Sequence, residues 1–139
     1  MLYMLDTNIC IYIIKKKPVQ VLNRLRKHDL SDICISSITL SELEYGVEKS
    51  QKKAQNKLAV TRFVAPLEIM AYDDRATVQY GAIMATLEKT GKPIGAMDLL
   101  ISAHARSLNC ILVTNNEKEF SRVPDLLIEN WVPIDRMFF

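Results

Sequence analysis

The chain has 139 residues, with 18 Lys or Arg against 16 Asp or Glu, which gives a formal net charge of +2. This length favours one domain that buries roughly two-thirds of its unfolded surface without disulfides, and so small a net charge identifies no nucleic-acid partner by itself. No segment reaches the ~18 apolar residues of a membrane span, and no basic, apolar leader opens the chain. We therefore expect a soluble, cytoplasmic protein without a membrane partner.

The three cysteines, Cys10, Cys34 and Cys110, are odd in number and far apart in the sequence. Each lies in an apolar stretch, and none has the spacing of a metal site. We expect free, buried thiols in a reducing compartment.

The first predicted element is a buried strand over residues 2–5, an apolar run that ends abruptly in Asp6-Thr7-Asn8. Asn8 is a favourable N-cap for the helix that the following isoleucines predict. Asp6 has two interpretations. It is either a turn residue whose carboxylate accepts bonds from nearby backbone N–H groups, or an acid at the carboxyl edge of a sheet, where ligands bind.

Pro18 is placed to start a second helix, and polar residues break that helix before the next strand. This buried strand covers Ile33–Ser36, and from Ile38 the apolar spacing becomes helical. Glu42 thus lies in the first turns of a helix that leaves the carboxyl end of a strand. It is either a solvated residue that complements the helix dipole or a second acid at the edge.

Residues 51–64 are expected to form a helix that Pro66 ends, and residues 67–71 a third strand. A long helix follows over residues 73–89, with Gly91 as its C-terminal signal. The two glycines and one proline that come next exclude regular structure in the loop before the following helix.

Asp98 lies in the first turn of that helix, which ends near Asn109, and it is either a dipole-complementing residue or a third acid at the edge. Lys92, in the loop just before it, is either a phosphate contact or a solvated lysine. His104 is more often a packed or surface residue in such a position than a catalytic base.

Cys110–Val113 form the clearest strand of the chain, which stops at Thr114-Asn115-Asn116 before a short helix that contains Glu119. This is the fourth junction of strand, polar turn and helix that bears acids or their amides. A last short strand over residues 126–128 and the aromatic cover Trp131 complete a predicted domain of residues 1–132.

Residues 133–139 are too few to form a domain and are expected to be a short C-terminal tail. Its end, Phe138-Phe139, either docks on the domain or contacts a partner.

Strands that alternate with helices, without a clear hairpin, predict an α/β fold with a parallel, doubly wound sheet. The carboxyl ends of all parallel strands lie at one edge of such a sheet. The side chains expected to meet there are Asp6, Glu42, Asp98 and Asn116 or Glu119.

Several carboxylates in one cleft need protons or a cation, because two of them ~4 Å apart repel by about 4 kcal/mol at an effective dielectric near 20. Oxygen ligands without a His or Cys cluster favour Mg²⁺ or Mn²⁺ over Zn²⁺. Such an ion can bind a phosphodiester oxygen and lower the pKa of a bound water that attacks phosphorus.

Four stretches carry a family resemblance: Leu5-Asp6-Thr7-Asn8, then Ser37 to Leu43 with Tyr45-Gly46, then Met97-Asp98 with Ile101 to Ala105, and Val113 to Phe120. Together they resemble the four motifs of PIN-domain nucleases, and more narrowly the VapC toxins of bacterial toxin–antitoxin pairs, over nearly the whole chain. Each motif alone is unspecific, whereas four in this order and spacing are specific.

The resemblance implies a PIN-like three-layer α/β/α sandwich with a mostly parallel central sheet. It also implies a Mg²⁺-dependent endoribonuclease, with Mn²⁺ as the alternative ion, that cuts tRNA; close relatives cut initiator tRNA. The expected partners are a second copy in a homodimer and a VapB-type antitoxin. That antitoxin inserts a segment into or beside the active-site groove and joins the toxin in a complex on operator DNA.

By the same resemblance, Asp6 and Asp98 would be the principal metal ligands and Glu42 the third acid. Thr7 and Thr114 would be supporting hydroxyls.

The fourth acid departs from the family pattern, because many relatives have Asp where Asn116 stands. Its role falls either to Glu119 or to the carbonyl of Asn116. Asn8 and Lys92 complete the expected set of substrate-binding or supporting residues.

Three other classes share parts of this pattern. A haloacid-dehalogenase-type phosphatase, a Mg²⁺-dependent enzyme, needs a second Asp where Asn8 stands. A response-regulator receiver needs a paired acid after the first strand and a Lys after the fifth. A catalytically inactive PIN-like RNA- or protein-binding module is the remaining alternative, and the presence of Asp6, Glu42 and Asp98 argues against it.

Overall fold

A computed structural model describes residues 1–133 of the chain. The strands are β1 (Tyr3–Leu5), β2 (Ile33–Ser36), β3 (Glu68–Met70), β4 (Ile111–Val113) and β5 (Leu127–Glu129). The helices are α1 (Thr7–Lys15), α2 (Val19–Arg26), α3 (Ser37–Glu48), α4 (Lys53–Val64), α5 (Asp74–Thr90), α6 (Ala96–Ser107) and α7 (Glu117–Phe120), with a 3-10 turn at Leu30–Asp32. Phe138 and Phe139 lie outside the described residues, so the prediction for them stays a prediction.

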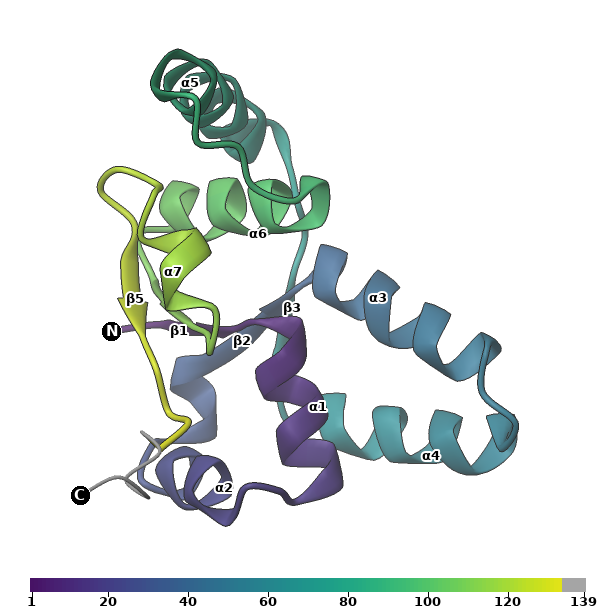
Figure 1. The fold of residues 1–139 in the computed structure, drawn as a ribbon. Helices are drawn as coiled ribbons and strands as arrows, with labels where there is room; N and C mark the ends of the chain where they lie inside the picture. Colours follow the sequence, from purple (N-terminus) through teal and green to yellow (C-terminus); the bar gives the residue numbers. More distant parts are fainter. Residues whose placement is uncertain (134–139) are drawn as a thin grey trace, which may run out of the picture.

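All five strands pair in parallel, in the order β3-β2-β1-β4-β5 (Figure 1). The central strand is β1, where Tyr3 lies opposite both Ile33 and Ile111. The order runs outward from β1 through β2 to β3 on one side and through β4 to β5 on the other. The boundary between β1 and β4 is therefore the topological switch point, where ligands bind in open α/β sheets.

Successive side chains of a strand point to opposite sides of the sheet, and the strands β1, β2 and β4 are covered by apolar residues on both sides. On one face Leu5, Ile35 and Val113 pack with residues of α1 to α4. On the other face Met4 and Leu112 pack against α6 and the Phe120 ring of α7. Figure 1 shows the sheet between these two helical layers, with α5 packed outside α6. The predicted three-layer α/β/α sandwich is confirmed.

The start of α1 differs from the sequence prediction. Asp6, not Asn8, is the N-cap: its Oδ1 accepts the N–H of Thr7 at 2.8 Å, and its backbone is extended. The reason is that β1 runs into α1 without an intervening turn, so the residue after the strand is already the cap. Asn8 lies exposed in the first turn of α1.

The other predicted boundaries agree with the structure to within one or two residues. Gly91 ends α5 in the left-handed conformation, with φ of 66°, as its position predicted. Cys10, Cys34 and Cys110 are free and buried, also as predicted. Over residues 1–133, none of the helices has both the length and the apolar character required to span a bilayer.

Candidate active site

The strands at the switch point are joined by a buried hydrogen bond between side chains. Thr114, which follows β4, donates from Oγ1 to Oδ2 of Asp6, which follows β1, at 2.8 Å. The backbone N–H of Asp6 also donates to the carbonyl of Val113 at 2.9 Å. The first predicted acid is therefore fixed at the point where the fold favours a ligand.

Both interpretations of Asp6 apply at once. Its carboxylate caps α1 and also lies in an acidic cluster, with only 4% of the residue exposed. Burial raises its pKa, and the charges of Glu42 and Glu119 raise it further, against the opposing bonds from Thr114 and Thr7. A buried carboxylate with other carboxylates around it is costly to ionise unless a cation is near.

Glu42, on α3, is tied to α1 by a chain of hydroxyl groups. Thr7 Oγ1 donates to Glu42 Oε1 at 2.6 Å. The Thr39 hydroxyl lies 3.3 Å from that of Thr7, and since Thr7 has one proton, Thr39 is the donor of this second bond. Thr39 is fully buried and was not predicted to belong to the site. Its signal was a polar residue among apolar ones, one helical turn before Glu42.

Asp98 and Glu119 form a carboxyl–carboxylate pair across the start of α6. Burial, followed by the hydrogen bond and the charge of Glu119, raises the pKa of Asp98 to about 7. For Glu119, burial is the largest influence and opposes ionisation. Bonds from Asp98, from the Gly95 N–H and from Asn116, together with the charge of Arg122, still lower its pKa overall. The two carboxyl groups therefore resist being ionised together in the absence of a cation.

Glu119 is held in place by groups from two loops. Its Oε1 accepts the N–H of Gly95, the N-cap of α6, at 2.5 Å, and its Oε2 accepts the amide of Asn116. A Cβ atom on Gly95 would lie 3.5 Å from Asp98 Oδ2 and 3.6 Å from Glu119 Oε1. The structure therefore brings Glu119 to the cluster, where Asn116 orients it through the amide.

Asn8 and Lys92 are not fixed at the cluster. Both are exposed, and within residues 1–133 neither side chain forms a hydrogen bond to another group of the chain. Arg122, which was not among the predicted site residues, is a cation near the cluster: its charge lowers the pKa of Glu119.

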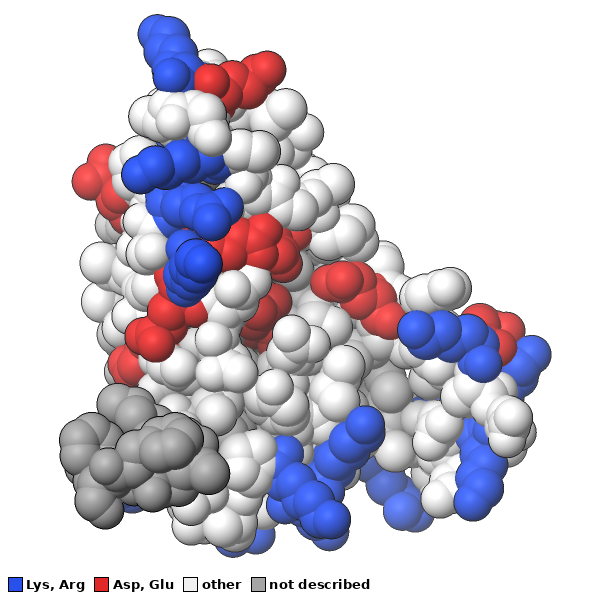
Figure 2. Space-filling model, in the orientation of Figure 1, with Lys and Arg blue, Asp and Glu red and all other residues white. Residues whose placement is uncertain are grey.

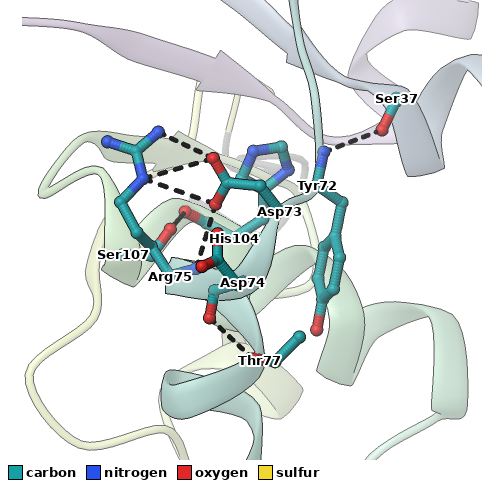
Figure 3. A network of polar contacts seen from close by, with 8 residues as sticks. All are labelled: Ser37, Tyr72, Asp73, Asp74, Arg75, Thr77, His104 and Ser107. Carbon is teal, nitrogen blue, oxygen red and sulfur yellow. Dashed lines mark hydrogen bonds and ion pairs between the residues drawn. The ribbon is translucent and has the colours of Figure 1, made fainter.

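His104 lies behind the site, at the opposite end of α6 from Asp98. Its ring is 1% exposed, and Nδ1 is 2.7 Å from Oγ of Ser36, the N-cap of α3. Figure 3 shows the ring among Tyr72, Asp73 and Ser107, next to the Asp73–Arg75 ion pair. Burial lowers the pKa of His104, so the ring is neutral. Its surroundings agree with the packed role favoured from the sequence.

Replacing His104 by Leu is expected to lower the free energy of unfolding by about 1–3 kcal/mol, because a buried hydrogen bond between α6 and α3 is lost. Urea unfolding at pH 7.5 measures the change. Ser41→Ala, which removes an exposed bond on the same α3, is the control and should cost less than about 0.5 kcal/mol. Equal stability of the two variants would contradict a structural role for the buried pair.

The donor set at the edge fits a hard divalent cation. The candidate ligands are all carboxylate oxygens. Those of Asp6, Glu42 and Glu119 accept hydrogen bonds from hydroxyl or backbone amide groups of the chain. Within residues 1–133, no group of three or more His, Cys, Asp or Glu side chains is close enough to hold a metal ion. Mg²⁺ commonly uses only one or two carboxylates and keeps several waters. The raised pKa values of Asp6 and Asp98 are the electrostatic cost that such an ion would relieve.

A groove of about 250 Å³ reaches the cluster from the side of α1, α3 and α4. Glu42 lies in its wall, and apolar side chains such as Ile11, Leu43 and Val47 form much of the rest. An apolar groove that ends at an acid can hold a side chain or segment of another molecule.

The fold and this acidic edge define the class of protein, since the sequence pattern of the PIN domain family matches residues 3–126. Ribonuclease VapC2 of Rickettsia felis is 49% identical over 132 residues, covering 94% of this chain and 98% of that protein. The tRNA(fMet)-specific endonuclease VapC of Shigella flexneri is 46% identical over 129 residues, covering 93% and 97%. The chain belongs to the VapC ribonuclease family of PIN domains.

Two crystal structures show the same architecture. VapBC2 from Rickettsia felis, bound to a DNA fragment from its promoter, superposes with a TM-score of 0.88 at 47% identity, covering 95% of this chain and 100% of that one. DNA-bound VapBC from Salmonella typhimurium gives a TM-score of 0.89 at 45% identity, with the same coverage.

Proposed function

We propose that the chain is a Mg²⁺-dependent endoribonuclease that cuts tRNA, and that it is the toxin of a type II toxin–antitoxin pair. The observation that carries the chemistry is that burial and the charges of Glu42 and Glu119 raise the pKa values of both Asp6, at the switch point of the sheet, and Asp98. These acids come from four separate segments, and their mutual repulsion makes the edge a site for a cation.

Asp6 and Asp98 would hold the ion, with Glu42 as a third acid; Mn²⁺ is the alternative metal. When bound, the ion would polarise a phosphodiester oxygen and lower the pKa of a water. The chain's own residues orient the acids: Thr114 holds Asp6, Thr7 holds Glu42, and the Gly95 N–H holds Glu119.

The substrate proposal rests on relatives. Proteins 46% and 45% identical to this chain are named tRNA(fMet)-specific endonucleases, which supports initiator tRNA as the first substrate to test. An RNA substrate of this kind is met in the cytoplasm, and three buried, free thiols agree with that compartment.

The partner proposal is a VapB-type antitoxin, supported by similar chains solved as VapBC complexes bound to promoter DNA. The apolar groove beside Glu42 suits an antitoxin segment that blocks the acids. We also propose a homodimer. Exposed apolar side chains on α5, among them Val78 and Met84, support a contact between copies.

The test of the activity is incubation of the purified chain with total bacterial tRNA and Mg²⁺, with and without EDTA. The Asp6→Asn variant should cut about 100-fold more slowly or worse, because even the loss of a group that supports a ligand costs 10–100-fold. Asp32→Asn, an exposed acid on the 3-10 turn, is the control and should cut like the wild type.

Equal cutting by wild type and Asp6→Asn would contradict the proposed site. RNA that is bound but never cut, at any Mg²⁺ concentration, would indicate an inactive binding module instead.

A further inference from the structure

Arg122 lies beside the acidic cluster, and its positive charge is not paired with a carboxylate of the described residues. Its Nη1 donates to the backbone carbonyl of Pro93 at 2.9 Å, in an exposed position. Within residues 1–133, Arg122 forms no ion pair with a carboxylate. A neutral carbonyl therefore fixes the guanidinium, and the positive charge stays available to an anion.

The Pro93 carbonyl places this charge close to the acids. Gly95, two residues further on, donates its N–H to Glu119 and lies against Asp98. The backbone N–H of Arg122 also donates to the carbonyl of Glu119 at 3.1 Å, which places Arg122 one turn after that acid. The effect of the Arg122 charge on Glu119 agrees with this proximity. Figure 2 shows blue basic side chains directly bordering the red acids on this face.

The chemistry of arginine suits a phosphate in this position. The guanidinium has five N–H donors in a planar fork, and the Pro93 carbonyl occupies a donor on one nitrogen. The remaining donors can reach two oxygens of one phosphate. Lys92 is a weaker candidate, because its exposed side chain has no partner within the described residues to fix its direction.

We propose that Arg122 binds a backbone phosphate of the RNA substrate next to the acidic cluster, so that the neighbouring phosphodiester reaches the metal-binding acids. This role rests on the proposed ribonuclease function. Arg122 is then a substrate-binding residue, fixed by the loop before α6 in advance of RNA binding.

The experiment measures RNA affinity as a function of salt. Arg122→Gln, Arg122→Lys and the control Arg62→Gln, an exposed arginine on α4, are each made in the Asp6→Asn background, so that the RNA survives. Fluorescence anisotropy with unfractionated bacterial tRNA and Mg²⁺, from 50 to 300 mM KCl, gives the dissociation constant and its salt slope.

Arg122→Gln is expected to weaken binding about tenfold at low salt and to reduce the salt slope by about one, because one phosphate contact is lost. Arg122→Lys keeps the charge and should retain the slope with a smaller loss of affinity. Arg62→Gln should match its Asp6→Asn parent.

An unchanged slope and affinity for Arg122→Gln would overturn the proposal. A fall equal to that of Arg62→Gln would do the same, since it would show only a general effect of charge. If Arg122→Gln does not fold, as shown by circular dichroism, the lysine variant decides: an RNA affinity equal to that of its Asp6→Asn parent contradicts the phosphate contact, because a lysine cannot replace the planar fork of an arginine. RNA cleavage by the wild type is measured separately, so failure of the ribonuclease function and failure of this contact give different results.

Discussion

The Asp98→Asn variant should lose RNA cleavage by about 100-fold or more while its metal-free form becomes more stable than the wild type at pH 8. The reason is that Asp98 is a metal ligand in the proposed site, and burial and the charge of Glu119 make its ionised form unfavourable in the metal-free folded chain. Urea unfolding in EDTA at pH 5 and pH 8, beside the cleavage assay, tests both effects.

The sign of the pH effect follows from the raised pKa. Folding shifts the pKa of Asp98 from an ordinary 3.8 to about 7, so the folded chain binds a proton that the unfolded chain has released. This contribution to stability is complete below pH ~4, declines as the pH rises towards 7 and is lost above it. The asparagine variant lacks this decline. The pKa of His104 is lowered on folding in the wild type and in the variant alike, so its effect cancels when their free energies of unfolding are compared.

Asp74→Asn is the matched control, because Asp74 also lies in the first turn of a helix but is exposed on α5. It should cleave RNA like the wild type and follow its pH dependence. If Asp98→Asn behaved like Asp74→Asn, Asp98 would be a residue that only complements the helix dipole.

Trp131→Ala should lower the free energy of unfolding by about 3–5 kcal/mol, a large part of the stability of a domain of this size. The indole is 2% exposed, stacks on His28 with 5.2 Å between ring centroids, and donates from Nε1 to Glu129 at 2.8 Å. It belongs to the core cluster that contains Val21 and Leu25 of α2, so its removal leaves a cavity in that layer.

Leu127→Ala provides the comparison for the tryptophan. Leu127 belongs to the same C-terminal segment but is 47% exposed, so its loss should cost less than about 1 kcal/mol. Urea unfolding of both variants measures the difference. Similar losses would show that the indole is not part of the core.

The architecture was predictable because its signals are local. Apolar runs such as residues 2–5 and 110–113, each followed by polar residues and a helical period, predict alternating strands and helices. Such an alternation forms a parallel sheet with right-handed crossovers in nearly all proteins. The error at Asn8 has a physical origin. Sequence alone does not show how many residues separate a strand from a helix, and both Asp6 and Asn8 are good caps.

The meeting of Asp6, Glu42, Asp98 and Glu119 at one edge followed from topology, since all strand ends of a parallel sheet lie together. The groups that orient them did not follow. The Thr39 hydroxyl, the Gly95 N–H and the Pro93 carbonyl become partners only through tertiary contacts between distant segments. The position of Arg122 was not predictable from the sequence for the same reason, whereas Lys92 is close to Asp98 in the sequence itself.

Calorimetric titration of the metal-free chain with Mn²⁺ at pH 7.5 most directly tests whether these acids form a cation site. We expect saturable binding with proton release to the wild type, and binding weakened about tenfold or more in Asp6→Asn and Asp98→Asn. Glu68→Gln, an exposed acid on β3, should bind like the wild type. Equal Mn²⁺ affinity in the wild type and both aspartate variants would contradict the proposed site.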